Sequence, residues 1–340
     1  MNQIEMWQQD TFDPDRIDLE LGWAESIGIN TLRVPLHDVV WEHDATGFQR
    51  RIGKFLNLVE KHKMRVIFVL FDSLGDPYPE LGHQRQPKPG VRNALWAQSP
   101  GAKGLVDAKE LQKALLYAED VVANNAIDKR ILAWDVWNEP DTTNIGRFST
   151  SEPPGKVDMV ARFLPEAFRY VRAGSPTQPV TSGLWQGDWS SLAKLSTVER
   201  LQVDLSDVIS FQNYDGPAEF EKRVQWLKAF GRPVLCTGFL DRGHGSTIEA
   251  ILPIALKYNV AAIAGDLVEG KLQNYLPWDS WQNPYTGDRK PDVWAQDIFT
   301  RTGPPYNQKE VDLIKHLIAS APKPAPVGPK PKKPGKGSAK

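Results

Sequence analysis

The residue with the clearest chemical potential is Glu139, in the run Trp137-Asn138-Glu139-Pro140. Residues 131–136 are mostly apolar, as a buried parallel strand requires, and Pro140 has no N–H with which to extend a strand ladder. Asn138 and Glu139 should therefore lie at the carboxyl end of a strand, where parallel α/β folds bind their ligands. A Trp and a Pro on either side give this carboxylate apolar neighbours, which raise its pKa toward general acid/base use. In a Glu-Pro pair alone, the Glu would more often be solvated or cap a helix. The complete run 137–140 favours a catalytic role for Glu139.

Short apolar strands alternate with amphipathic helices along the whole chain, which predicts a parallel sheet covered by helices. Besides the strand that ends at Glu139, the pattern predicts strands at 30–36, 65–71, 179–185, 207–214, 233–239 and 261–268. It predicts helices at about 13–27, 46–63, 109–126, 156–173, 190–202, 217–230, 247–259 and 308–320. Two segments, 73–107 and 270–306, are too long to be simple connectors, and the first is expected to form a cleft wall.

The chain divides into a folded region, 1–320, and a tail, 321–340. Pro recurs in the tail together with six Lys and no aromatic residue, which predicts polyproline II structure or disorder. It could tether the folded region to a polyanion or another module, but a solvated tail without a partner is the favoured interpretation.

The run Trp137-Asn138-Glu139-Pro140 resembles the acid/base strand of the clan A glycoside hydrolases, which are retaining (β/α)8-barrel enzymes. Further motifs over nearly the whole chain resemble the cellulase-like bacterial members near family 5, and they lie at 30–34, 36–38, 68–72, 182–189, 210–214 and 277–281. The resemblance implies a (β/α)8 TIM-type barrel, 1–320, acting on β-linked poly- or oligosaccharides without a cofactor. In such barrels the first strand precedes the segment that matches Glu5-Met6-Trp7, so that strand is missing from this chain. We expect a start upstream of Met1, with a seven-stranded or partner-completed barrel as the alternative.

The resemblance assigns the acid/base role to Glu139, but the second catalytic carboxylate of the family is absent. A retaining glycosidase needs two carboxyl groups about 5–5.5 Å apart. The family places its nucleophile in a Cys-Thr-Glu-Tyr-like run at the end of the seventh strand, and here the run is Cys236-Thr237-Gly238-Phe239. Because Gly238 has no side chain, hydrolysis of the family type is expected to be weak or absent.

Further departures from the family pattern gather at strand ends that face the expected cleft. The altered positions are Pro35, Ser73, Gly75, Gln212, Ala264 and Gly265. Most of these changes remove volume, and Ala264-Gly265 stands where the family usually has Asn-Trp. They predict a pocket widened for another purpose, by natural divergence or by design.

Another carboxylate could replace the missing nucleophile. Asp241 follows Gly238 by three residues, and Asp266 and Glu269 end the last predicted strand. A carboxylate about 6.5–9.5 Å from Glu139 could activate water in an inverting mechanism. Asp266 is the most interesting of the three, although a surface Asp near a helix start is the simpler interpretation.

Other residues match supporting positions of the family site. Arg33 resembles the clan Arg that orients the nucleophile, and its charge could instead lower the pKa of Glu139 or hold an anion. Sugar-binding or supporting positions are matched by His37, Asp72, Trp137, Asn138, Trp185, Gln212 and Tyr214. Core packing is an alternative for each. The pairs His37-Asp38 and His43-Asp44 are too few to predict a metal site.

Composition excludes several classes of partner. The net charge of −1 does not predict nucleic acid or an anionic membrane as a partner, and no apolar run is long enough to span a bilayer. The single Cys236 excludes an internal disulfide and reads as a buried hydrophobe. The first residues lack a signal peptide, whereas family members are usually secreted or periplasmic, so the location stays open. A monomer is expected.

Three functions remain open at this point. The first is a β-glycanase-lineage hydrolase that uses Glu139 as acid/base. The second is a carbohydrate-binding protein without turnover, which the 12 Trp residues could serve by stacking on sugar rings. The third is a repurposed catalyst, in which Glu139 alone removes a proton from a small aromatic molecule in the widened pocket.

Overall fold

The computed structural model describes residues 1–144 and 148–321, and seven parallel strands lie at the centre of this part. One sheet has the order β1-β2-β3-β4 and the other β5-β6-β7. Their bounds are β1 Thr31–Pro35, β2 Arg65–Asp72, β3 Ile131–Asn138, β4 Val180–Thr181, β5 Ile209–Gln212, β6 Val234–Phe239 and β7 Ala261–Ala264. A bridge between Leu184 and Phe211 joins the two sheets, so the strands follow one another from β1 to β7.

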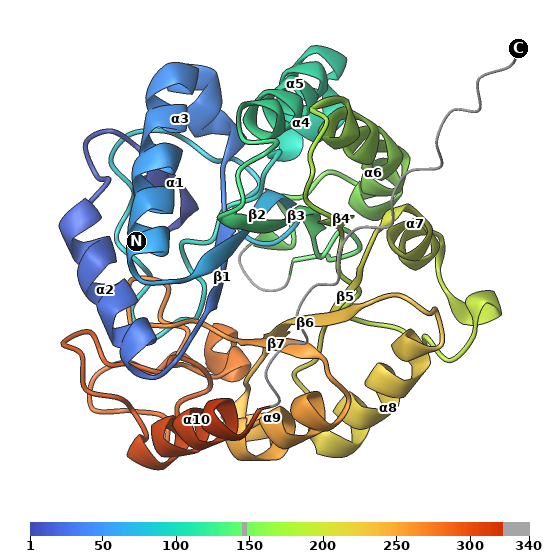
Figure 1. Ribbon diagram of the computed structural model, residues 1–340. Coiled ribbons are helices and arrows are strands. Elements are labelled where there is room, and N and C mark those ends of the chain that lie inside the picture. Colours follow the sequence, from blue (N-terminus) through green and yellow to red (C-terminus); the bar gives the residue numbers. More distant parts are fainter. Residues whose placement is uncertain (145–147, 322–340) are drawn as a thin grey trace, which may run out of the picture.

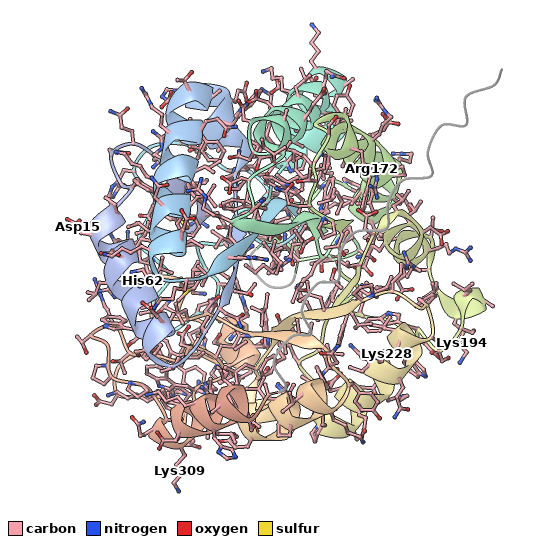
Figure 2. All side chains as sticks on the ribbon, viewed as in Figure 1. Asp15, His62, Arg172, Lys194, Lys228 and Lys309 are labelled. Carbon is pink, nitrogen blue, oxygen red and sulfur yellow. The ribbon has the colours of Figure 1, made fainter. Side chains whose placement is uncertain are left out.

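Helices surround the strands as an outer ring (Figure 1). They are α1 Gln3–Trp7, α2 Pro14–Ser26, α3 Asp38–Lys61, α4 Ala102–Val106, α5 Ala108–Asn124, α6 Lys156–Ala173, α7 Thr197–Leu205, α8 Pro217–Lys228, α9 Ile248–Lys257 and α10 Gln308–Ser320. Charged side chains project from this ring into solvent, as Asp15, Arg172, Lys228 and Lys309 do (Figure 2). The arrangement is a (β/α) TIM-type barrel, so the predicted fold class is confirmed.

The barrel is open between β7 and β1, because no hydrogen-bonded ladder joins these two strands in the described residues. Residues of β2, β3 and β6 are almost all buried, whereas most residues of β1 and β7 are only partly buried. Pro35 fits this edge position. The N–H of Leu36 donates to the carbonyl of Val69 in β2, so the nitrogen of Pro35 faces the opposite, open side. Proline has no N–H to donate, and on this side no strand ladder in the described residues requires one. A missing first strand is consistent with this geometry.

The hydrophobic core has two outer clusters and one small inner cluster. The outer clusters lie between the helices and the two sheets, around Trp134 in one and Phe211 in the other. Inside the barrel, Ile67, Ala133 and Leu235 pack together with Leu132 and Ile263. This apolar floor leaves the upper part of the barrel free for polar side chains. Cys236 is fully buried, as predicted.

Several predicted boundaries were wrong for identifiable reasons. Helix α3 begins at Asp38 and not at 46, and its backbone kinks at Asp44, whose carboxylate accepts from the N–H of Gly47. The predicted strand 179–185 and the predicted strand 261–268 are each shorter, because their later residues leave the ladder for loops. The helix predicted at 190–202 is a 3₁₀ turn at Leu192–Lys194 followed by α7, which begins at a capping box of Ser196 and Glu199.

The periodic signal also missed the shortest elements. Helix α1 and helix α4 have five residues each, which is too short for an amphipathic pattern to be recognised. Of the predicted tail 321–340, only Ala321 is described, so that prediction concerns residues outside the described ones. Within the described ranges, no helix is both long and apolar enough to cross a membrane.

Candidate active site

Glu139 lies directly after β3 in an unusual backbone conformation. Its φ of +46° is in the left-handed region, which non-glycine residues rarely adopt and which recurs at functional sites. One carboxyl oxygen, Oε2, accepts a hydrogen bond of 2.9 Å from the hydroxyl of Thr142. Burial, and after it the negative charge of Asp72, raise the pKa of Glu139 to about 7. Near neutral pH this carboxyl can therefore either give or take a proton.

Asp72 is a second buried carboxyl beside Glu139, at the end of β2. Its Oδ2 accepts from the indole of Trp96 at 3.0 Å and from the amide of Asn138 at 3.1 Å, and its Oδ1 accepts from the N–H of Leu74 at 2.7 Å. These donors favour the ionised form, but burial outweighs them and raises the pKa of Asp72 to about 6. The site thus contains two neighbouring carboxyls that titrate above their usual range.

A chain of hydrogen bonds joins Arg33 to Tyr214 across the top of the barrel. Arg33 Nη2 donates to Asp135 Oδ2 at 2.7 Å and to Asn138 Oδ1 at 2.8 Å. The amide of Gln212 donates to the same oxygen of Asn138 at 2.8 Å, and the hydroxyl of Tyr214 donates to Gln212 Oε1 at 3.2 Å. Asp135 forms an ion pair with Arg33 and so balances the charge of the guanidinium. Arg33 therefore lowers the pKa of Glu139 less than burial and Asp72 raise it.

The space above Gly238 is not empty. A Cβ atom at Gly238 would lie 2.7 Å from the hydroxyl oxygen of Tyr214 and 3.4 Å from Cγ of Gln212. Burial raises the pKa of Tyr214, and the charge of Glu139 raises it further, so the hydroxyl is a neutral phenol. A phenol therefore occupies the position from which a side chain at 238 would enter the site.

The other altered glycines also have close neighbours. A Cβ at Gly265 would lie 2.7 Å from Cδ of Gln296, and a Cβ at Gly75 would lie 2.2 Å from the carbonyl oxygen of Trp96. Gly75 has a φ of +95°, so its loop requires glycine for a backbone reason. At these positions, as at Gly238, atoms of neighbouring residues already lie where a Cβ would be, and the widening of the pocket stays a prediction.

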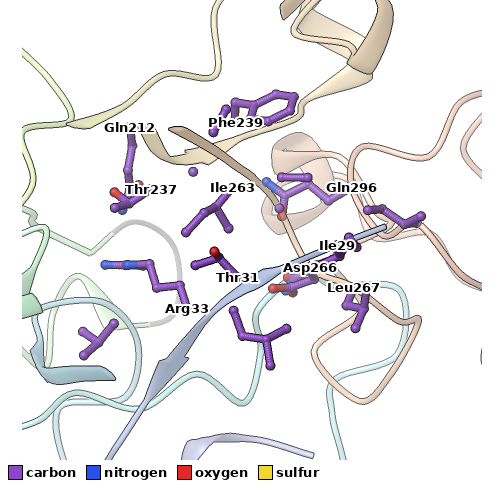
Figure 3. A pocket seen from close by; sticks show the side chains of 18 of the residues that line it. Ile29, Thr31, Arg33, Gln212, Thr237, Phe239, Ile263, Asp266, Leu267 and Gln296 are labelled. Carbon is purple, nitrogen blue, oxygen red and sulfur yellow. The ribbon is translucent and has the colours of Figure 1, made fainter. Parts of the chain in front are cut away.

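A cavity of about 640 Å³ nevertheless connects the site with the open side of the barrel. Figure 3 shows Arg33 and Gln212 on one side and Asp266 and Gln296 on the other, with Thr31 and Ile263 between them. The predicted site residues that line this cavity are Arg33, Pro35, Asp72, Asn138, Glu139, Gln212, Tyr214, Gly238, Ala264, Gly265 and Asp266. Its volume is typical of small-ligand sites.

Two of the three candidates for a second carboxylate lie outside this cavity. Asp241 is buried and accepts a hydrogen bond of 2.9 Å from His244, and Glu269 accepts from the N–H of Arg301 at 3.2 Å. Asp266 lines the cavity, and burial raises its pKa while Arg92 opposes the shift. Asp266 thus stays the only one of the three that the structure brings to the cavity.

The remaining predicted site residues support the site from behind. The indole of Trp137 donates to the hydroxyl of Ser73 at 2.9 Å, and the indole of Trp185 donates to Asp141 at 2.8 Å. His37 is completely buried, with Nδ1 at 3.1 Å from a carboxyl oxygen of Asp38. These side chains hold strand ends and loops and do not line the cavity.

Sequence reasoning missed several residues that line the cavity or touch the carboxyls. Trp96 and Arg92 come from the long loop 73–107, Asn274 comes from the loop 270–306, and Thr142 follows Glu139. The length of the two loops was the available signal, since long loops in a barrel often form the site. Among the residues described, no three or more His, Cys, Asp or Glu side chains come together as metal ligands would.

Comparison with known proteins relates the fold to a family of enzymes. No protein-family model and no curated protein matches the sequence. Among solved structures, GH5_18 from Streptomyces cattleya in complex with GlcNAc aligns with a TM-score of 0.63 at 12% identity, over 96% of this chain and 80% of that chain. β-Mannanase from the blue mussel Mytilus edulis aligns with a TM-score of 0.58 at 14% identity, over 93% and 88%. A glycoside hydrolase family 5 mannosidase from Rhizomucor miehei aligns with a TM-score of 0.55 at 15% identity, over 94% and 92%. The chain therefore has the fold of family 5 glycoside hydrolases, as the resemblance predicted.

Proposed function

We propose that this protein is a barrel of glycoside hydrolase lineage whose cavity binds a β-linked poly- or oligosaccharide, with Glu139 as its general acid/base. The observation that carries the proposal is the setting of Glu139. It lies at the carboxyl end of β3, in the cavity, with a pKa of about 7 and a second carboxyl beside it. The bound saccharide GlcNAc in the similar structure from Streptomyces cattleya is consistent with a sugar ligand.

The missing step is nucleophilic attack on the anomeric carbon. A protonated Glu139 can give its proton to the leaving oxygen, but retaining hydrolysis also needs a second carboxylate to form the glycosyl intermediate. The hydroxyl of Tyr214 stands above Gly238 as a neutral phenol, which is a poor nucleophile. We therefore expect family-type hydrolysis to be weak or absent.

Azide rescue with an aryl β-glycoside tests this proposal. Azide would attack the anomeric carbon, the bond to the aryl oxygen would break, and Glu139 would give its proton to that oxygen. The product would be a glycosyl azide of inverted configuration. Because the hydroxyl of Tyr214 narrows the space above Gly238, rescue should be stronger in Y214F than in the parent chain. Tyr258 lies outside the cavity, so Y258F is the matched control.

Two outcomes would contradict the proposal. If neither the parent chain nor Y214F releases the aryl group in response to azide or formate, Glu139 does not act as a general acid on a bound glycoside. If the parent chain hydrolyses soluble β-glycan with retention at ordinary rates and without added anion, Gly238 does not block the chemistry. Retardation in gels cast with β-glucan, mannan or xylan, without any turnover, would instead support a carbohydrate-binding protein.

A second candidate function is proton abstraction from a non-sugar substrate by Glu139 alone. The apolar part of the cavity favours this reaction. Leu132, Leu235 and Ile263 line it, and their apolar side chains suit an aromatic ring. A benzisoxazole is a suitable probe: Glu139 would take the ring C–H proton while the N–O bond breaks to give a cyanophenolate. This reaction needs the carboxylate, so its rate should rise with pH through about 7, whereas proton donation to a leaving group should fall through the same range.

A further inference from the structure

Polar atoms without hydrogen-bond partners gather at the Asp266 end of the cavity. Among the described residues, Arg92 Nε, Asn93 Oδ1, Asn274 Oδ1 and both carboxyl oxygens of Asp297 are buried without a partner. The side chains of Arg92, Asn274 and Asp297 are at least nine-tenths buried. Buried polar groups almost always have a partner, so such a cluster calls for water, an ion or a ligand.

Arg92 is the most unusual member of this cluster. Its Nη1 donates to the carbonyls of Asn274 at 2.6 Å and Leu276 at 3.1 Å, and its guanidinium lies over the ring of Trp278 at 4.2 Å. In the described part of the chain, no carboxylate oxygen lies within 4.0 Å of the guanidinium nitrogens. Among the described residues, Nε is buried without a partner, and the edge that it forms with Nη2 can donate two parallel bonds to one ligand.

The two loops that carry these residues are fastened to each other. The N–H of Asn93 donates to the carbonyl of Leu272 at 2.8 Å, and the N–H of Arg92 donates to the hydroxyl of Ser280 at 3.1 Å. The amide of Gln273 donates to the carbonyl of Val91 at 2.9 Å. A cluster held in this way is organised before any ligand binds, which reduces the entropy lost on binding.

The cluster shares a cavity with Glu139. Arg92, Asn93 and Asn274 line the same cavity as Glu139. Tyr214 lies within electrostatic range of both Glu139 and Arg92. Figure 3 shows Asp266, their neighbour, across the pocket from Arg33. A chain of sugar rings that has one ring at Glu139 could therefore place the next one here.

The mixture of free donors and acceptors indicates the kind of group that fits. A hydroxyl both donates and accepts, so it can take a bond from Arg92 and give one to an Asn oxygen. The carboxyls of Asp266 and Asp297 lie near Arg92 and disfavour an anionic group, while Arg92 itself disfavours an ammonium group. We propose that Arg92, Asn93 and Asn274 form a second sugar subsite, next to that of Glu139, which binds vicinal hydroxyl groups of a pyranose ring. This inference rests on the proposed saccharide ligand and adds a subsite to it.

The test is a double-mutant-type cycle, in which the removal of a side chain is combined with the removal of a ring hydroxyl and the binding affinities are compared. The probes are the β-1,4-linked trisaccharides of mannose, glucose and xylose, and monodeoxy analogues of the one that binds best. Binding is followed by calorimetry and by Trp fluorescence, because Trp96 and Trp278 line the cavity. N274A should weaken binding about five- to tenfold, the usual effect of one lost hydrogen bond. The same variant should cause no further loss with the analogue that lacks the hydroxyl bound by Asn274.

Controls separate a subsite from a structural role. Asn283 lies in the same loop with an exposed side chain, so N283A should leave binding unchanged. R92K keeps the charge but loses the two-pronged edge, and it should weaken binding more than N274A does. Because Arg92 also holds two backbone carbonyls, R92K could fail to fold, and N274A and N93A then carry the test.

Each outcome is decisive for the subsite and separable from the proposed catalysis. Equal affinity of N274A, N93A and the parent chain, or no binding of any trisaccharide at millimolar concentration, would overturn the subsite and leave water as the partner of these atoms. Azide rescue together with such insensitivity would retain the function and reject the subsite. Binding that depends on Asn274 without any rescue would support the subsite and reject acid/base catalysis by Glu139.

Discussion

At the scale of single residues, the site is a pair of carboxyls whose pKa values are both raised by burial. Among the described residues, the carboxyl of Asp72 accepts three hydrogen bonds, whereas that of Glu139 accepts one, from Thr142. Burial raises the pKa of both, that of Asp72 from 3.8 to about 6 and that of Glu139 from 4.5 to about 7, so Asp72 keeps the lower pKa that an aspartate ordinarily has, and its hydrogen bonds act in the same direction. Asp72 thus ionises first, and its charge then helps to keep Glu139 protonated. This order suits a site in which Glu139 gives a proton.

Removing the charge of Asp72 should lower the pKa of Glu139. The reason is that burial and the charge of Asp72 both raise it, so D72N leaves burial alone and the pKa should remain above its ordinary value. The measurement is the pH dependence of the ¹³C shift of the Glu139 carboxyl, assigned by its absence in E139Q. D215N, at an exposed aspartate, is the control. An unchanged titration of Glu139 in D72N would show that the two carboxyls do not interact.

A carboxylate restored at position 238 should need room made by Tyr214. The hydroxyl oxygen of Tyr214 would lie 2.7 Å from the new Cβ, so G238E alone should lose about 1–3 kcal/mol of stability through overpacking and should hydrolyse poorly. The double variant G238E/Y214F removes the obstructing oxygen and should regain stability. It should also hydrolyse an aryl β-glycoside faster than G238E does.

Urea unfolding and initial rates measure these two effects, with Y214F alone as the control. Gly238 has no positive φ, so a side chain there meets no backbone strain, and the obstacle lies in Tyr214 and the neighbouring Gln212. If G238E is as stable and as active as the double variant, the hydroxyl of Tyr214 does not fill the space of the missing side chain.

At the scale of the elements, the open side between β7 and β1 determines how much each strand contributes to the stability of the fold. Strands β2 and β3 have neighbours on both sides, whereas β1 and β7 have one ladder each in the described residues. The open side exposes part of Ile263 in β7 to the cavity, and Ile67 in β2 is fully buried in the barrel floor. Equivalent apolar residues should therefore differ in their contribution to stability.

Truncating Ile67 should cost more than truncating Ile263. We expect I67A to lower the free energy of unfolding by about 3 kcal/mol, as buried large-to-small changes do. For I263A we expect about 1 kcal/mol, because its side chain already borders empty space and loses fewer contacts. Urea denaturation at equal pH compares the two variants. Similar losses, or a larger loss for I263A, would mean that the open side is closed in solution.

The sequence predicted the elements better than their ends. Long periodic segments such as α5 and α6 were found, because an amphipathic pattern over several turns is specific for a helix. The ends of β4 and β7 were missed, since ladder pairing and not composition decides where a strand stops. For the site, the run around Glu139 placed a carboxyl in the cavity. The hydrogen bond from Trp96 to Asp72 could not be predicted from the sequence, because it depends on how the loop 73–107 folds back.

The neighbours of the glycines were invisible in the sequence for the same reason. A glycine suggests empty space, but the side chains of Tyr214 and Gln296 that occupy that space come from other strands and loops. The cavity extends to the open side between β7 and β1, whereas the sequence had predicted it from altered side chains. The volume of a cavity depends on how all the surrounding elements pack, so it cannot be predicted from the positions of small residues alone.

At the scale of the whole molecule, buried and surface carboxyls oppose each other in the dependence of stability on pH. Burial raises the pKa of the carboxyls in and around the cavity, which are Asp72, Glu139, Asp141, Asp266 and Asp297. Surface hydrogen bonds and ion pairs lower the pKa of others, among them Asp18, Glu25, Glu110, Asp128 and Glu221. A group with a raised pKa in the folded state weakens folding as pH rises from the unfolded pKa through the folded one. A group with a lowered pKa strengthens folding above the unfolded pKa, and that gain is lost as pH falls.

The two sets together predict greatest stability near pH 5. Below about pH 4 the surface carboxyls become protonated and lose their partners. Above about pH 5 the cavity carboxyls retain protons that the unfolded chain has already released, so stability declines until these carboxyls also ionise, by about pH 8. Urea unfolding from pH 3 to 9 measures the profile. E139Q should remove roughly 2 kcal/mol of the decline between pH 5 and 8, given a pKa raised from 4.5 to about 7 and a side chain that is only partly buried. E166Q, at an exposed glutamate, should leave the profile unchanged. A stability that rises steadily to pH 8, or a decline that E139Q does not reduce, would mean that Glu139 is ionised at neutral pH, and the proposed proton donor would then lack its proton.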